Sequence, residues 1–154
     1  MTPEVRLVWK ADCLLGEGPV WLAEEQALRF VDIKRSRLHR FVPTTGERET
    51  LEVGGKPSFI VPESGGGFLV GSEHGVHRLT GDRLGACVAA IEQPTNNRTN
   101  DGTVDAQGRL WFGTMDDAEQ QPTGALYCLD AAGLHKMGGK AVVTNGPAIT
   151  PDGK

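Results

Sequence analysis

Long apolar runs, an excess of positive charge and paired cysteines are all missing from this sequence of 154 residues. No apolar run approaches the ~18 residues of a membrane-spanning helix, so we expect no membrane partner. The net charge of −4 gives no basic surface of the kind that binds nucleic acid, so we expect no nucleic-acid partner. Residues 1–6 lack the apolar core of a signal peptide, which predicts a cytoplasmic protein.

Cysteine and histidine are few and widely spaced. Cys13, Cys87 and Cys128 are an odd number and form no Cys-x-x-Cys pair, so they predict neither a zinc knuckle nor a redox pair. We expect ordinary reduced thiols. His74 and His77 lie three apart in strand-like sequence, where their side chains point to opposite faces and would not share a metal ion.

Aromatic residues are also scarce, with one tyrosine and five phenylalanines, whereas glycine is abundant at 21 residues. That is roughly twice the average share of glycine. The glycines are spread along the chain without low-complexity sequence, so they indicate many tight turns. Many turns in a chain of this length predict short strands, and the length allows one domain.

One pattern occurs four times along the chain: apolar residues, a polar turn and then an apolar strand. The second turn residue of each repeat is Glu25, Gly65, Gly108 or Gly153. Their spacing of about 40 to 45 residues is typical of propeller blades and of helical arrays. Short apolar runs at 28–33, 110–112 and 124–129 favour strands, because none reaches the length or the periodicity of a helix.

The repeat therefore predicts an all-β propeller of four-stranded antiparallel blades. The first blade is expected at 19–22, 27–33, 37–42 and 48–51. The second is expected at 59–61, 67–70, 75–79 and 83–90. The third is expected at 103–104, 110–114, 124–129 and 134–137. A fourth blade would begin at 147–150 and turn at 151–154.

Three and a half blades cannot close a ring, because propellers have four to eight blades. We therefore expect residues 1–154 to be the N-terminal part of a single propeller domain that is truncated in its fourth blade. A missing C-terminal half or a second chain would close the ring.

Oxygen-bearing residues recur at one position of the repeat. Glu17, Asn100 and Asn145 each lie eight residues before the second turn residue and just before the first strand of a blade. The second blade has Pro57 there instead, with Ser58 beside it. First strands line the channel of a propeller, so the three oxygens would converge and suit a hard divalent cation. The alternative is that these residues only form turns and loops.

Several motifs of this chain occur in the order of a known family. They are 16–21 (Gly-Glu-Gly-Pro-Val-Trp), 31–33 (Val-Asp-Ile), 38–40 (Leu-His-Arg), 98–102 (Arg-Thr-Asn-Asp-Gly), 105–115, 144–147 (Thr-Asn-Gly-Pro) and 151–153 (Pro-Asp-Gly). Together they make the chain resemble the N-terminal half of the SMP-30/gluconolactonase/regucalcin-like family. The stretch from 98 to 115 is the most specific match.

The resemblance implies a six-bladed propeller that holds one divalent cation, Ca²⁺, Zn²⁺, Mn²⁺ or Mg²⁺, and hydrolyses small sugar lactones. It implies that Glu17 and Asn145 are metal ligands and that Arg98 binds substrate. It also implies that Asn100 lies beside the metal and contacts substrate or metal-bound water. It also implies an acidic substrate contact after Met115, for which Asp116, Asp117 and Glu119 are candidates. Thr99 departs from the family, which usually has an aromatic residue there.

The resemblance leaves the chemistry of this chain incomplete. The aspartate that serves the family as base and as a metal ligand would lie beyond Lys154, so no catalytic residue is expected within these residues. We expect the isolated chain to be inactive. Two alternatives remain: a non-catalytic, calcium-binding protein of the regucalcin type, and an inactive truncated product.

Overall fold

A computed structural model describes residues 4–150 and 152, and almost all of its regular structure is β-strand. The first sheet contains β1 (Gly16–Leu22), β2 (Ala27–Asp32), β3 (Arg37–Val42) and β4 (Glu47–Glu52), with one short 3₁₀ turn, η1 (Ile33–Arg35). The second contains β5 (Phe59–Pro62), β6 (Phe68–Ser72), β7 (Gly75–Thr80) and β8 (Arg83–Ala90). The third contains β9 (Asn97–Val104), β10 (Leu110–Asp116), β11 (Gly124–Asp130) and β12 (Gly133–Ala141).

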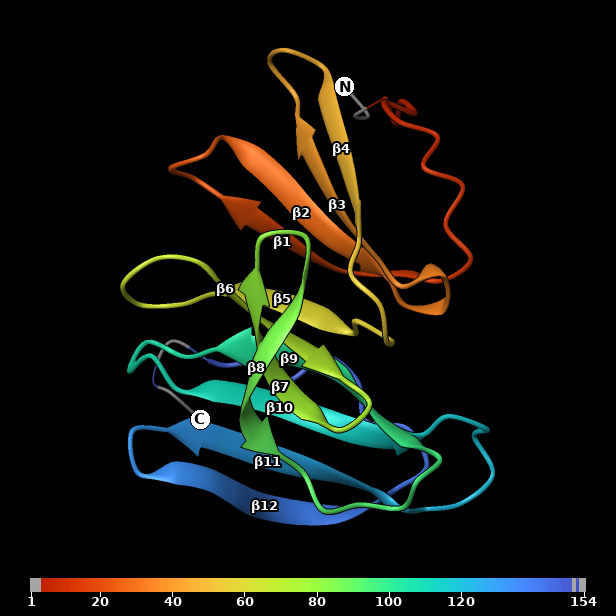
Figure 1. Cartoon of the computed structure of the whole chain (residues 1–154), viewed down its shortest axis with the longest axis vertical. Coiled ribbons are helices and arrows are strands. Elements are labelled where there is room, and N and C mark those ends of the chain that lie inside the picture. The colour runs from red at the N-terminus through yellow and green to blue at the C-terminus, as the bar shows by residue number, and fades with distance from the viewer. Residues whose placement is uncertain (1–3, 151, 153–154) are drawn as a thin grey trace.

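Each sheet is an antiparallel meander whose strands pair in chain order, and the three sheets follow one another like blades (Figure 1). The prediction of four-stranded antiparallel blades is confirmed, and we refer to the sheets as blades 1 to 3. No helix in the described part of the chain is long and apolar enough to cross a membrane.

The structure corrects two details of the prediction. Glu17 and Asn100 lie within β1 and β9 rather than before them, because both strands continue past a β-bulge. No strand forms at 147–150, because no described residue pairs with that stretch to make a ladder. Of the predicted turn at 151–154, only residue 152 is described, and it lies in a turn.

The first strand of each blade is the inner one, since β1, β5 and β9 contact one another. Alternate residues of a strand point to opposite faces, and β5 uses both. Phe59 and Val61 enter the core that blade 2 shares with blade 3, whereas Ile60 enters the core shared with blade 1. The short central strand therefore joins the two cores.

The ring of Phe59 fills the place where the inner strands meet. Glycine flanks it on two strands: a Cβ added at Gly71 would lie 2.2 Å from the ring, and one added at Gly102 would lie 2.9 Å from it. Gly18 of β1 has a φ of +55° and packs against the backbone of Phe59. The strands approach closely because these positions carry no side chain.

Replacing Phe59 with alanine tests this packing. The Phe59→Ala variant should lose about 3–5 kcal/mol of unfolding free energy, the usual cost of a large cavity in a core. Chemical denaturation of the variant and the wild type measures the difference. Met137→Ala serves as control, since Met137 is 52% exposed on β12. Equal losses in the two variants would contradict the central role of Phe59.

The hairpin between β9 and β10 is fastened by one carboxylate. Asp105 accepts hydrogen bonds from the backbone N–H groups of Gln107 and Arg109, from Arg109 Nε at 2.6 Å and from Trp111 Nε1 at 2.9 Å. Burial alone raises the pKa of the Asp105 carboxyl, but these donors outweigh it and lower the pKa to about 2. The ionised form of Asp105 therefore stabilises the fold.

The sign of this shift predicts a pH dependence. The pKa of Asp105 is about 3.9 in an unfolded chain, so its contribution is complete well above that pH and is lost as the pH falls toward 2. Thermal unfolding of the wild type and of Asp105→Asn should show a difference in Tm that is constant above about pH 5 and shrinks below about pH 4. A difference that persists unchanged at lower pH would contradict this role for Asp105.

Candidate active site

Matching β-bulges position two of the candidate residues. The β1–β2 ladder is irregular between Glu17 and Val20, and the β9–β10 ladder is irregular where Asn100 and Asp101 stand opposite Gly113. The β5–β6 ladder of blade 2 is regular. Bulges turn side chains away from the ordinary pleat and are frequent beside active sites. Between the first and second strands, irregular pairing thus occurs in blades 1 and 3, which carry Glu17 and Asn100, and not in blade 2.

Asn100 is tied to the segment that carries Asn145. Its Nδ2 donates to the carbonyl oxygen of Thr144 at 2.6 Å, and Thr144 Oγ1 donates to the carbonyl oxygen of Thr114. This approach requires glycine at 113, because a Cβ there would clash with the Thr144 side chain. The structure therefore brings Asn100 and the backbone next to Asn145 together.

A neighbouring carboxylate holds the same turn. Asp101 accepts hydrogen bonds from the N–H of Gly102 through Oδ1 and from the N–H of Gly146 through Oδ2. Gly146 has a φ of +52°, close to the +55° of Gly18, and each glycine directly follows a candidate ligand. The backbone thus has the same feature, a glycine with positive φ, directly after Glu17 and directly after Asn145.

The predicted ligands have the chemistry for a divalent cation. Glu17 and Asn145 are both exposed, and neither side chain has a hydrogen-bond partner within the described residues. Asn100 Oδ1 accepts a hydrogen bond from Arg98 Nη1 at 2.8 Å and keeps a second lone pair. One carboxylate and two amide carbonyls fit a hard cation. Glu17 and Asn145 line different cavities, however, of about 390 and 530 Å³.

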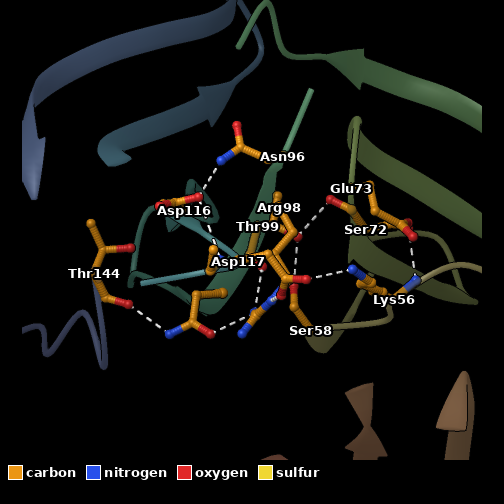
Figure 2. Close-up of polar contacts among 12 residues, drawn as sticks. Lys56, Ser58, Ser72, Glu73, Asn96, Arg98, Thr99, Asp116, Asp117 and Thr144 are labelled. Carbon is orange, nitrogen blue, oxygen red and sulfur yellow. Dashed lines mark hydrogen bonds and ion pairs between the residues drawn. The ribbon is translucent and has the colours of Figure 1, made fainter. Parts of the chain in front are cut away.

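Arg98 lies at the centre of a polar cluster (Figure 2). It is 4% exposed, and its Nε donates to Asp117 Oδ1 at 2.6 Å. Lys56, from the loop between β4 and β5, donates to the other carboxylate oxygen of Asp117. Burial raises the pKa of Asp117, but the hydrogen bonds from Lys56 and Arg98 outweigh it and lower the pKa, so Asp117 is ionised at neutral pH.

A cavity of about 640 Å³ opens above this cluster. Residues of all three blades line it, among them Leu15, Lys56, Arg98 and Asp117. Arg98 Nη1 is occupied by Asn100 and by the carbonyl oxygen of Thr99, whereas Nη2 has no hydrogen-bond partner among the described residues. The guanidinium therefore retains donors for a ligand that enters the cavity.

The structure separates the three acidic candidates that follow Met115. Asp116 is fully buried and accepts hydrogen bonds from the N–H groups of Gln120 and Gln121. These bonds, chiefly the one from Gln120, lower the pKa of its carboxyl. Glu119 is exposed with a φ of +57°. Asp116 therefore shapes the loop and Glu119 lies at its surface, while Asp117 lines the cavity.

Sequence reasoning missed a chain of hydroxyl groups beneath Arg98. Thr99 is fully buried, and its Oγ1 donates to the carbonyl oxygen of Ser72 at 2.8 Å. Since the single hydroxyl proton of Thr99 is used there, Ser58 Oγ must donate to Thr99 Oγ1 at 2.6 Å. The one indication of this in the sequence was Thr99 itself, since the family usually has an aromatic residue at that position. A threonine fits because Ser58 and Ser72 supply its partners.

The different roles of Asp116 and Asp117 predict different variants. Asp116→Ala removes the acceptor of the loop N–H groups and should lower Tm clearly. Asp117→Ala leaves the loop hydrogen bonds intact, so its Tm should fall less. Differential scanning calorimetry of both variants measures the two shifts. A larger loss of Tm in Asp117→Ala would show that the two residues are assigned the wrong way round.

Comparison with known proteins shows the family of this chain. The chain matches the SMP-30/gluconolactonase/LRE-like region over residues 15–154 and therefore belongs to that family. It is 36% identical over 157 residues to 6-deoxy-6-sulfogluconolactonase of Pseudomonas putida, covering 99% of this chain and 53% of that protein. It is 35% identical over 155 residues to pentonolactonase XacC of Haloferax volcanii, covering 96% of this chain and 50% of that protein.

A solved structure has the same fold as this chain. Regucalcin of Agrobacterium tumefaciens, described as a calcium-binding protein, superimposes with a TM-score of 0.85 at 25% identity, over 92% of this chain and 48% of that one. The chain thus spans about half the length of the curated relatives and the solved structure that it matches. The predicted family is confirmed.

Proposed function

We propose that this chain is the N-terminal part of a metal-dependent lactonase that hydrolyses small sugar lactones. The observation that carries the proposal is Arg98, a nearly buried guanidinium whose Nη2 has no hydrogen-bond partner among the described residues and which lines a cavity built by three blades. The relatives named as sugar lactonases support the same activity. Residues 1–154 then form part of a single propeller domain, completed by a C-terminal part or a second chain.

Arg98 and Asp117 give the chain its substrate-binding role. Asp117 fixes Arg98 through Nε, so Nη2 is held in place to donate to a ring or hydroxyl oxygen of the lactone. Lys56 offsets the charge of Asp117 and adds a second cation at the cavity. The positive charges favour a substrate that gains negative charge as water attacks its carbonyl carbon.

Glu17 and Asn145 would hold a divalent cation, with Asn100 beside it. When bound, a cation stabilises negative charge on a lactone oxygen. Asn100 is suited to orient ligands there, because its amide is fixed between Arg98 and the carbonyl oxygen of Thr144. The base that takes the proton of the attacking water lies outside residues 1–154 under this proposal, so these residues bind and orient.

The alternative function is calcium binding without catalysis. The likeness to a solved regucalcin, a calcium-binding protein, favours it. Both functions use Glu17 and Asn145, and they differ only in turnover. An inactive truncated product is the third possibility, in which neither turnover nor tight cation binding is present.

Lactone hydrolysis by the protein purified from its source, at its native length, tests the proposal. Acid release from gluconolactone should exceed the spontaneous rate and stop on chelation of the metal. In the same protein, Arg98→Ala should raise KM about ten- to a hundredfold, as expected for a lost hydrogen bond from a charged group. Glu17→Gln should weaken cation binding more than about tenfold.

Arg83→Ala is the matched control, because Arg83 is exposed on β8, away from the cavity. Cation binding with no turnover above the spontaneous rate would replace the lactonase by the calcium-binding function. Unchanged cation affinity in Glu17→Gln would remove Glu17 from the site.

A further inference from the structure

Cys13, Asp32 and His39 meet in blade 1, and none of the three is among the residues assigned above. One ligand atom from each of the three lies within 4.8 Å of the others. Cys13 precedes β1, Asp32 ends β2 and His39 lies in the middle of β3. The sequence spacing of these residues predicted no metal site, but the meander brings them together.

His39 presents one ring nitrogen to this cluster. The residue is 3% exposed, and its Nδ1 lies 2.9 Å from Thr50 Oγ1. Its Nε2 faces Cys13 Sγ at 3.7 Å. Its ring stacks on Phe30 at 4.7 Å between centroids. Burial lowers the pKa of His39, so the imidazole is neutral and can offer a lone pair at Nε2.

Asp32 is held rigidly by the chain that carries Cys13. It is fully buried, and its two oxygens accept hydrogen bonds from the backbone N–H groups of Leu14 and Leu15 at 3.1 and 3.0 Å. The backbone N–H of Arg35 is a third donor to this carboxylate, which leaves about one of its four lone-pair sites for a further ligand. Because Leu14 directly follows Cys13, these bonds also fix the thiol beside the carboxylate.

The spacing suits zinc. With Zn–S of about 2.3 Å and Zn–N of about 2.0–2.1 Å, tetrahedral geometry separates the sulfur and nitrogen ligands by roughly 3.6 Å. The distance between Cys13 Sγ and His39 Nε2 is 3.7 Å. An imidazole whose other nitrogen is hydrogen-bonded, here to Thr50, is the usual arrangement of a zinc-binding histidine.

The charges balance as well. Without metal, the site holds one buried negative charge on Asp32 next to a thiol whose pKa is raised by burial and by Asp32. Binding of Zn²⁺ releases the thiol proton to solvent and leaves a thiolate, a carboxylate and a neutral imidazole around the ion. Two negative charges then match the two positive charges, so the buried group carries no net charge.

We propose that Cys13, Asp32 and His39 form a binding site for Zn²⁺ or a similar thiophilic divalent cation. The site has three protein ligands and an open fourth position for water, toward the half-exposed side of Cys13. It is distinct from the oxygen site of Glu17 and Asn145, because it supplies sulfur and nitrogen. Bound metal would tie the segment before β1 to β2 and β3.

Cobalt(II) titration of the chain tests the proposal. Co²⁺ bound to a thiolate gives a sulfur-to-metal charge-transfer band, which an oxygen-only site cannot give. We expect one equivalent of Co²⁺ to produce this band and Zn²⁺ to displace it. Zn²⁺ should also raise Tm, because it binds the folded state.

Variants assign the band to residues. Cys13→Ser and His39→Gln should each abolish it or weaken Zn²⁺ binding by more than about tenfold. Cys128→Ser is the matched control, since Cys128 is a buried cysteine that belongs to no such three-ligand cluster among the described residues. Glu17→Gln should keep the band, and circular dichroism of each metal-free variant checks that it folds.

The outcomes are distinct. A band that is absent from the wild type, or that survives in Cys13→Ser, would overturn the proposal and leave a neutral hydrogen-bond network at Cys13, Asp32 and His39. A band that disappears only in Cys13→Ser and His39→Gln supports the site. Neither result depends on lactone hydrolysis.

Discussion

The close approach of three inner strands around Phe59 is the constraint on which the rest of this structure depends. The inner strands can approach only where side chains are absent: Gly102 on β9 and Gly71 on the neighbouring strand β6 leave that space to one aromatic ring. β5 then distributes its side chains to both neighbouring blades. The cavity lined by Arg98 depends on this packing, because the packing fixes the three blades relative to one another.

The same constraint explains why the site residues lie at bulges. An inner strand with regular pleat would point its alternate side chains into the blade interfaces, where a carboxylate or an amide would be buried without partners. The extra residue after Glu17 and at Asn100 breaks that alternation near the start of β1 and in the middle of β9. Blade 2 keeps a regular β5–β6 ladder and contributes instead Ser58 and Lys56, which contact residues of blade 3.

Much of the fold could be predicted from the sequence, because turns and short apolar strands recur with one period. The start of β9 was the main error, because its residues from Asn97 to Gly102 are polar residues and glycine, which disfavour strands on propensity alone. Pairing with β10 overrides that propensity. The family motifs proposed Arg98 and Asn100 as site residues, but they did not predict which of three acidic residues lines the cavity, since loop hydrogen bonds decide it.

Contacts between residues far apart in sequence could not be predicted in this way. Lys56 and Asp117 are separated by 61 positions and Cys13 and His39 by 26, so neither pair has a local pattern. Both pairs follow from the meander and the packing of blades. They also show different solutions to buried charge: Asp117 accepts hydrogen bonds from two cationic side chains, whereas Asp32 accepts hydrogen bonds from backbone N–H groups and has only the nearby charge of Arg35 to offset its own. Because no cationic side chain among the described residues is hydrogen-bonded to Asp32, a cation is favoured at Asp32 rather than at Asp117.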